Sequence, residues 1–203
     1  TVTTEEALSI YQLFGFDFGA SVDHMPVQQI TTSRGKYQLS QKEQERRIRI
    51  TQDNAARFLA LHRERRCTFI PVGVIQGTDV KSYASQVIEY VRMGYDHIAL
   101  GGLVPRSDAE IVEIMRAVSQ ALGKRRGDVW IHLFGVYRPT IHAELRQLGV
   151  ASFDSATYYR KAWLRSGQNY LSVDGRWYAA IRIPMSNDPR TRKRLNLSGG
   201  SWE

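Results

Sequence analysis

The feature that most constrains the fold of this chain is a regular alternation of short apolar runs with longer amphipathic stretches. The apolar runs are nearly continuous, which is typical of strands buried on both faces of a sheet. Strand and helix patterns that alternate in this way favour a parallel sheet with helices outside it. We therefore expect an α/β fold. The five apolar runs cover residues 14–23, 67–77, 97–102, 129–136 and 150–156.

Local capping signals predict helices between these runs. Ser40 with Glu43, and Ser107 with Glu110, match the capping box, in which two side chains satisfy free backbone N–H groups at a helix start. Asp79 is expected to cap the helix after the second strand. The remaining signals are a helical pattern at 5–15, helix stops at Gly123 and Gly149, Pro139 in a first turn, and a last helix that ends near residue 164.

Two architectures accommodate parallel strand–helix units: an open doubly wound sheet, and a (β/α)8 barrel. A full barrel has eight units and takes about 250 residues, whereas this chain offers five units in 203 residues. Five units alone would leave unpaired sheet edges, which is unfavourable. We therefore expect residues 1–166 to form the C-terminal five strand–helix units of a TIM (β/α)8 barrel, as a fragment of a longer chain.

The last part of the chain has a different pattern. The stretch NYLSVDGRWYAAIRIP, residues 169–184, predicts a β-hairpin with Asp174 and Gly175 at its turn. The stretch TRKRLNLSGGSWE that follows is basic and rich in glycine and serine, which indicates a partly flexible tail. We therefore expect residues 167–203 to form a separate hairpin and tail.

The chain is basic, with 28 lysines and arginines against 20 acidic residues and a net charge of +8. An excess of this size favours a polyanionic partner, because neutralising phosphates releases counterions. Taken alone, each basic cluster also fits the solvated face or end of a helix. The clusters lie at residues 46–49, 63–66, 124–126 and 190–194.

Three further features narrow the class of protein. No run of about 18 apolar residues is present, so we expect no membrane span. Cys67 is the only cysteine, so neither a disulfide within the chain nor a zinc cluster built from cysteines is expected. We also expect no signal peptide and a cytoplasmic location.

Polar and small residues follow the expected strands at the point where each one ends. In parallel α/β folds, ligands bind at the carboxyl ends of the strands. We therefore expect these residues to converge on one site. They are Asp23 after the first strand, Gln76 after the second, Gly101 and Gly102 after the third, Phe134 after the fourth and Asp154 after the fifth.

This set of residue types suits a planar heterocycle. Asp23 and Gln76 can bond to its edge, the Gly102 N–H can meet a carbonyl, and Phe134 can cover one face. Asp154 then remains available to form a covalent bond to the substrate. Each residue also has an ordinary structural reading: a loop cap for Asp23, backbone bonding for Gln76, a tight turn for the glycine pair, core packing for Phe134 and a helix cap for Asp154.

Weaker candidates surround this set. His24 can assist proton transfer beside Asp23, although a single loop histidine is more often a bystander. No spacing of His, Cys or carboxylates indicates a catalytic metal. The other candidates are His97 and His132 as core or supporting residues, Cys67 as a buried residue, Arg160 and Lys161 as phosphate contacts, and Tyr158 and Tyr159 as stacking or packing residues.

The stretches SVDHMP, PVGVIQG, IALGGL, HLFGV and FDSATYYRKAW together resemble the tRNA-guanine transglycosylases, in their order and spacing. The resemblance covers roughly residues 14–163 and implies the last five strands of a barrel that exchanges guanine for a 7-deazaguanine. It implies that Asp154 is the nucleophile at the sugar C1′ atom. It also implies that Asp23, Gln76 and Gly102 recognise the base, and that Phe134 replaces an apolar residue, often methionine, against the heterocycle.

The stretches FDSATYYRKAW and NYLSVDGRWYAAIRIP look more like the branch that modifies DNA. That likeness implies insertion of 7-cyano-7-deazaguanine into DNA, within phage-defence or phage-protection systems. It favours DNA over tRNA as the partner and leaves room for a helper ATPase or helicase. The same exchange in tRNA is the first alternative, and a non-catalytic nucleic-acid-binding partner is the second.

The sequence departs from the family pattern in two places. The family carries a further aspartate, in an Asp-Ser-Gly type motif on an earlier strand, which handles protons during exchange. Nothing in this chain matches it, and the motif would lie upstream of Thr1. The tRNA enzymes also bind zinc through a late Cys/His cluster that has no match here. We therefore expect no cofactor or metal within this chain and a catalytic centre that is incomplete without upstream residues.

Overall fold

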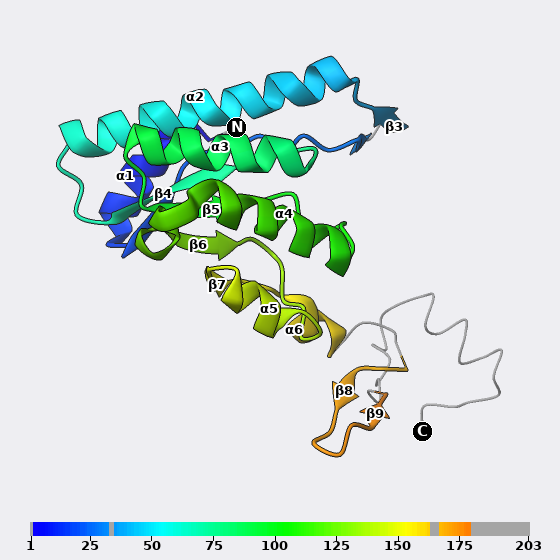
Figure 1. Ribbon diagram of the computed structural model, residues 1–203. Coiled ribbons are helices and arrows are strands. Elements are labelled where there is room, and N and C mark those ends of the chain that lie inside the picture. The colour runs from blue at the N-terminus through cyan, green and yellow to red at the C-terminus, as the bar shows by residue number, and fades with distance from the viewer. Residues whose placement is uncertain (1, 33–34, 163–166, 180–203) are drawn as a thin grey trace, which may run out of the picture. The chain divides into compact units, whose positions relative to one another are not determined.

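The computed structural model describes residues 2–32, 35–162 and 167–179 (Figure 1). The chain separates into two compact units, Thr1–Ser155 and Ala156–Glu203, and each is described by itself. The division at residue 166 that the sequence suggested stays a prediction. The end of the last expected helix and the basic tail lie outside the described residues.

The first unit is built on a five-stranded sheet in which every pairing is parallel, as the sequence predicts. The strand order follows the chain without a reversal. A doubly wound sheet reverses its order at a switch point, so the structure does not adopt that alternative. The strands are, in their order across the sheet, β1 (Phe18–Ala20), β4 (Ile70–Ile75), β5 (His97–Leu100), β6 (Trp130–Leu133) and β7 (Val150–Phe153).

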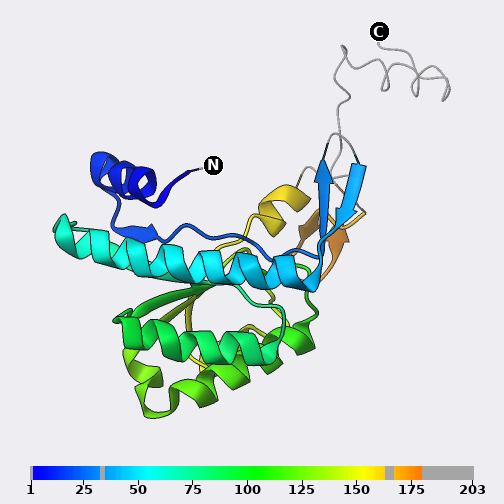
Figure 2. The ribbon, with the colours of Figure 1, turned by 90° about the horizontal axis from the view of Figure 1, so that it is seen from above.

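Helices connect these strands and follow them in the same order (Figures 1 and 2). None of the described helices is long and apolar enough to cross a membrane. The helices of the first unit are α1 (Thr4–Phe14), α2 (Gln41–Glu64), α3 (Val80–Met93), α4 (Asp108–Leu122), the 3-10 helix η1 (Gly123–Asp128) and α5 (His142–Gln147).

The capping predictions are confirmed at two helices and only half right at a third. Asp79 caps α3, and Ser107 with Glu110 forms a complete capping box at α4. At α2 the Ser40 hydroxyl accepts the Glu43 N–H at 3.3 Å, as expected. The Glu43 carboxylate does not complete that box, because it accepts instead from the arginines at positions 46 and 47.

Helix ends agree less evenly with the sequence. Gly123 ends α4 at a φ of +55°, in the left-handed region that favours glycine. Pro139 lies in a turn before α5 and not in its first turn, because the helix starts only at His142. The residue before that start, Ile141, makes no side-chain cap, so no polar signal marked the true beginning.

The two faces of the sheet are covered differently. Alternate strand residues pack with helix residues such as Tyr83, Val87 and Met115 in the main core. Those strand residues are Ile75, Ile98, Leu100, Ile131 and Leu133. Successive side chains of a strand point to opposite faces, so the intervening residues occupy the other face. There the rings of Phe18, Trp130 and His132 form a stack, with 5.7 Å between the centroids of successive rings.

The segment between β1 and α2 contains an element that the sequence did not suggest. Strands β2 (Gln29–Thr32) and β3 (Gly35–Gln38) form an antiparallel hairpin in which Ile30 lies opposite Tyr37. Figure 2 shows this hairpin beside the first turn of α2. We expected a polar loop here, because threonines, glutamines and lysine hide the short alternation of apolar residues.

The second unit contains α6 (Thr157–Lys161) and the strand pair β8 (Tyr170–Leu171) and β9 (Trp177–Tyr178). The predicted hairpin is therefore present, with Gly175 at a φ of +81° in its loop. The loop runs from Ser172 to Arg176 and is longer than the two-residue turn that we expected.

Candidate active site

The ends of four strands form a single row at one edge of the sheet. Ile75, Leu100, Leu133 and Phe153 are the last partners along the sheet register. The ladder continues one residue further, because the N–H groups of Gly101, Phe134 and Asp154 donate to the preceding strands. The structure thus brings together the residues that follow these strands, namely Gln76, Gly101, Phe134 and Asp154.

Gln76 and Asp23 form a direct pair at the start of this row. The Gln76 Nε2 group donates to Asp23 Oδ2 at 2.5 Å, and Gln76 itself is only 2% exposed. Among the described residues, the buried Gln76 Oε1 atom has no hydrogen-bond partner. A buried acceptor without a partner is unfavourable, so a donor that reached this oxygen would stabilise it.

The glycine pair after β5 is required by the close approach of Gln76. A Cβ atom on Gly101 would overlap Gln76 Nε2, and one on Gly102 would lie 2.9 Å from Gln76 Oε1. Gly102 also has a φ of +73°. The glycines therefore allow the Gln76 amide to pack against the backbone, in addition to forming the turn. We name Asp23, Gln76, Gly101 and Gly102 the amide end of the site.

Two buried side chains hold the backbone of the amide end. The Tyr83 hydroxyl donates to Gly101 O at 2.7 Å, and Gln86 Nε2 donates to Gln76 O at 2.8 Å. Burial raises the pKa of Tyr83, which keeps the hydroxyl protonated and able to donate. Both bonds tie strand ends to α3, so the base of the site is fixed by the core.

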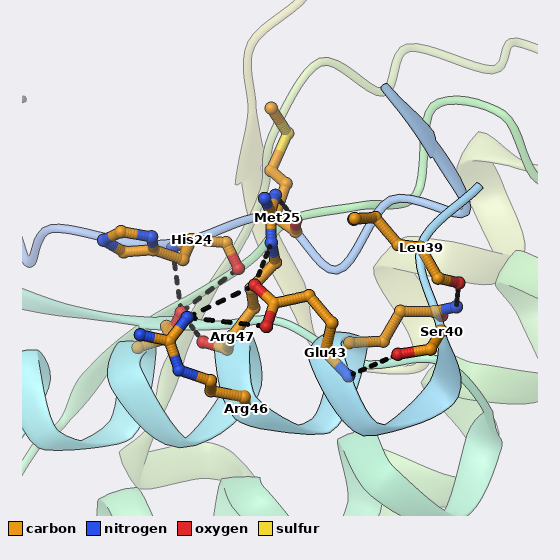
Figure 3. A network of polar contacts seen from close by, with 9 residues as sticks. His24, Met25, Leu39, Ser40, Glu43, Arg46 and Arg47 are labelled. Atoms are coloured by element: carbon orange, nitrogen blue, oxygen red, sulfur yellow. Dashed lines mark hydrogen bonds and ion pairs between the residues drawn. The ribbon is translucent and has the colours of Figure 1, made fainter. Parts of the chain in front are cut away.

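Helix α2 holds the loop that carries Asp23 (Figure 3). The buried Thr51 hydroxyl accepts the backbone N–H of His24 at 2.9 Å, and Asn54 donates to Val22 O at 3.1 Å. Arg47 donates to Met25 O at 3.1 Å. These contacts lie on both sides of Asp23 in sequence, so α2 fixes its position. The role of His24 in proton transfer stays a prediction.

Asp154 lies at the opposite end of the row and is open to solvent. Its side chain is 60% exposed, and its Oδ1 atom accepts from the Gly135 N–H at 2.9 Å and from His132 Nε2 at 3.2 Å. On its other side, His132 Nδ1 lies 2.7 Å from Ser152 Oγ. The N-cap of α6 is Ala156 and has no side-chain bond, so Asp154 does not cap that helix.

Phe134 stands beside this carboxylate and is partly exposed. Its ring meets the His132 ring edge-on, with centroids 4.8 Å apart. Phe134 is therefore not a buried core residue. The expectation that His132 is a supporting residue agrees with its contacts to both Phe134 and Asp154. We name His132, Phe134, Gly135, Ser152 and Asp154 the carboxylate end of the site.

Sequence reasoning missed Gly135 and Ser152 as members of the site. Ser152 lies two residues before Asp154, and His132 lies two residues before Phe134. Because a strand repeats every two residues, this spacing was a usable signal for side chains on one face. Gly135 has a φ of +70°, and its backbone N–H carries no sequence signal beyond the glycine itself.

A cleft of about 520 Å³ opens beside the amide end. Its lining includes Gly77, Gly102 and the segment from Met25 to Gln29, but neither Phe134 nor Asp154. Arg106 closes one side and donates to Thr78 O at 2.7 Å. The cleft thus reaches Gly77 and Gly102, which border the amide end, while Gln76 and Asp23 themselves do not line it.

The remaining candidates divide between the two units. Arg160, Tyr158 and Tyr159 are exposed on α6, where Lys161 is the last residue. Their contact with phosphates or bases stays a prediction. Cys67 is partly buried, and burial raises the pKa of its thiol. His97 lies in the ring stack and contacts Asp96 through Nδ1 at 2.7 Å.

The part of the chain that the structure describes holds no group of three or more His, Cys, Asp or Glu residues placed to bind a metal ion. The expectation that this chain carries no cofactor of its own stays a prediction.

Comparison with known proteins identifies the family. The family model described as queuine tRNA-ribosyltransferase matches residues 1–186. This match covers most of the chain, and the chain belongs to that family.

The curated relatives act on both kinds of nucleic acid. A DNA-guanine transglycosylase of Salmonella montevideo is 33% identical over 195 residues, which is 96% of this chain and 46% of the relative. A tRNA-guanine(15) transglycosylase of Haloarcula marismortui is 27% identical over 86% of this chain and 33% of the relative. A tRNA-guanine(15) transglycosylase of Pyrococcus abyssi is 34% identical over 50% of this chain and 17% of the relative. The chain thus spans less than half the length of these relatives.

Proposed function

We propose that this chain carries the nucleophile and the base-recognition residues of a pentosyltransferase that replaces guanine in DNA with 7-cyano-7-deazaguanine. The observation that carries the proposal is the row of strand ends, which unites an accessible carboxylate at Asp154 with the buried Gln76 amide and its exposed partner Asp23. One end is suited to covalent chemistry and the other to a planar base with donors and acceptors on its edge.

The exchange takes place in two displacements at the sugar C1′ atom. In the first, an Asp154 oxygen forms a bond to C1′ while the bond from C1′ to guanine N9 breaks. Guanine leaves with that electron pair and takes up a proton. In the second, N9 of the incoming base attacks C1′ and loses its proton, and the bond to Asp154 breaks. A carboxylate nucleophile divides one difficult substitution into two easier ones.

The amide end recognises the base in this proposal. The Asp23 carboxylate accepts from N–H groups on the edge of the base. Gln76 Oε1, which has no hydrogen-bond partner among the described residues, accepts from a further N–H group of the base. The Gly102 N–H donates to the base carbonyl, and Phe134 covers one face of the ring system. The cleft beside Gly102 supports this assignment, since it gives a base room to enter.

The choice of DNA over tRNA rests on the relatives. The DNA-guanine transglycosylase matches almost the whole chain at 33% identity, whereas the tRNA relatives match less of it or at lower identity. A base inside duplex DNA must be extruded or presented in a single strand before a carboxylate can reach C1′. A helper ATPase or helicase would supply such a strand. Guanine exchange in tRNA and a non-catalytic nucleic-acid-binding role are the alternatives.

We also propose that the sheet is part of a (β/α)8 barrel, closed by three strands of polypeptide that the structure does not describe. The unreversed strand order supports this, and so does the ring stack on the sheet face opposite the main core, where Phe18 is 44% exposed. Strands β1 and β7 each pair on one side only within the described sheet. Unpaired edges of this kind are unfavourable unless they are covered.

The proposal is tested by trapping the covalent intermediate with the longest natural form of the protein. Labelled DNA and labelled tRNA are offered separately with a deazaguanine analogue that stalls exchange, and adducts are separated on denaturing gels. We expect an adduct with DNA that Asp154→Asn reduces by about 10⁴-fold or more, since it removes the nucleophile. Asp128→Asn, at another exposed aspartate, is the matched control and retains the adduct.

The other outcomes separate the alternatives. An adduct with tRNA alone would transfer the function to RNA modification and keep Asp154 as the nucleophile. A protein that binds nucleic acid and forms no adduct with either substrate would refute the catalytic proposal and support the binding role.

A further inference from the structure

The carboxylate end contains a chain of contacts that the exchange reaction alone does not explain. His132 lies between Ser152 and Asp154, with Nδ1 2.7 Å from Ser152 Oγ and Nε2 3.2 Å from Asp154 Oδ1. The three side chains come from two neighbouring strands, β6 and β7, and from the residue that follows β7. His132 is therefore positioned to transmit an effect from Ser152 to the nucleophile.

A shift in the sheet register creates this arrangement. Ile131 lies opposite Val150, but the next pair is His132 opposite Ser152, so Ala151 is an extra residue on β7. Val150 packs against the main core, on the face of the sheet that the helices cover. In a regular strand Ser152 would share that face, since side chains alternate with a period of two. The bulge reverses the alternation and turns Ser152 and Asp154 toward His132.

Hydrogen-bond chemistry determines which nitrogen of His132 carries the proton. An ionised carboxylate only accepts, so a neutral His132 can bond to Asp154 only with its proton on Nε2. Nδ1 is then an acceptor and needs a donor, and the Ser152 hydroxyl at 2.7 Å provides one. The ring is also confined, since it stacks on Trp130 and meets Phe134 edge-on.

The same contacts distinguish the two oxygens of the nucleophile. Both the Gly135 N–H and His132 Nε2 donate to Oδ1 of Asp154. Oδ1 is thus held by two donors, and Oδ2 is the oxygen that remains to form the bond to C1′. When the second displacement breaks that bond, the same donors stabilise the carboxylate that is released.

We propose that Ser152 and His132 act as a positioning pair for Asp154. Ser152 fixes the tautomer of His132, and His132 orients the carboxylate so that Oδ2 attacks. In this role His132 positions the carboxylate and transfers no proton. This inference rests on the proposed role of Asp154 as the nucleophile, and it adds two residues that touch neither the base nor the sugar.

The first test is kinetic and uses the natural full-length protein. His132→Phe keeps a ring and removes the donor, and we expect the single-turnover rate of adduct formation to fall about 10–100-fold. The KM for the incoming base should change by less than about 3-fold, because the amide end is untouched. His132→Gln places an amide N–H near the position of Nε2 and should recover part of the rate. His97→Phe, in the same ring stack, is the matched control.

The second test asks whether Ser152 acts through His132. Ser152→Ala should lower the same rate, by about 3–10-fold, and Ser152→Thr should restore it. The double variant with His132→Phe should be no slower than His132→Phe alone, because the residues act in series. Losses that multiply in the double variant, or full rates in both single variants, would overturn the pairing.

The third test needs no substrate and separates this inference from the proposed function. Nitrogen-15 NMR of the imidazole reports which nitrogen is protonated. We expect the Nε2–H form of His132 in the parent protein and a mixture of tautomers in Ser152→Ala. A parent protein with the proton on Nδ1 would overturn the inference, whatever the trapping experiment gives. If the protein forms no adduct but shows the Nε2–H form of His132, only the proposed function is contradicted, and the inference about the tautomer stands.

Discussion

The two ends of the candidate site are built on different principles. At the amide end, Gln76 is 2% exposed and lies so close to Gly101 and Gly102 that neither position has room for a Cβ atom without displacement. At the carboxylate end, Asp154 is 60% exposed and is held by one backbone N–H and one imidazole. Gln76 and Gly101 of the first end are buried in the core, whereas the Asp154 side chain of the second is largely exposed.

This difference matches what each end has to do in the proposed base exchange. Recognition of the edge of a planar base requires donors and acceptors in fixed positions. The Gln76 amide is fixed because Nε2 donates to Asp23 and because Gly101 and Gly102 lie directly against the amide group. A nucleophile that attacks a polymeric substrate must instead be accessible from solvent. It must form a bond to C1′ in the first displacement and break that bond in the second. The rigid, buried residues and the accessible carboxylate thus lie at opposite ends of one row of strand ends.

The largest effect is expected from Gly101→Ala at the amide end. The added methyl group would overlap the Gln76 amide, which is buried and cannot move without losing its bond to Asp23. We expect a loss of about 1–3 kcal/mol in the free energy of unfolding, measured by urea denaturation. Affinity for the incoming base should fall with it.

The control for this variant is Gly127→Ala in η1. Nothing lies within 4 Å of a Cβ atom there, so stability and base affinity should stay close to those of the parent. If Gly101→Ala were as stable as this control, the amide end would have room to adjust, and its rigid character would be refuted.

A second effect, confined to alkaline pH, is expected from three buried tyrosines of the core. Burial raises the pKa of Tyr83, Tyr90 and Tyr95 above the usual value of 10.0. The unfolded chain therefore releases these phenolic protons at a lower pH than the folded protein does. The contribution of these tyrosines to stability should be constant below about pH 10 and should fall above it, by about 1.4 kcal/mol per pH unit for each tyrosine.

Tyr90→Phe tests this pH dependence directly. Its hydroxyl donates to Val74 O at 2.7 Å in the core, so its loss should cost about 1 kcal/mol at neutral pH. Above pH 10 the decline in stability should be shallower than in the parent. Tyr159→Phe, at a position 73% exposed, should leave the alkaline slope unchanged. Equal slopes in all three proteins would contradict the assignment to buried tyrosines.

Much of the fold could be predicted because its signals are local. The apolar runs gave the five strands, and Asp79, Ser107 and Gly123 marked helix ends through single hydrogen bonds or a single backbone conformation. The hairpin β2–β3 was missed because its strands present only Ile30 and Tyr37 as a weak apolar pattern. The start of α5 was misjudged because no polar side chain caps it.

The candidate site was predictable in outline and not in detail, for a related reason. The residues directly after each strand are visible in the sequence, and parallel strands bring them to one edge. The contact of His132 with Asp154 depends on a bulge that inserts Ala151 into the register of β7. The two-residue spacing places Ser152 on the face of Asp154, but the sequence carries no marker for the extra residue that turns this face toward His132.

The smallest effect, and the sharpest check of the comparison, is expected from Asp154→Asn as a stability variant. The side chain is largely exposed, and an asparagine oxygen can still accept the Gly135 N–H that Asp154 accepts at 2.9 Å. We expect the free energy of unfolding to change by less than about 0.5 kcal/mol, measured beside Gly101→Ala in urea. The same variant should lose the covalent adduct, so function and stability separate at this residue. A stability loss as large as that of Gly101→Ala would mean that the carboxylate end is as much a part of the core as the amide end, and the contrast between the two ends would not hold.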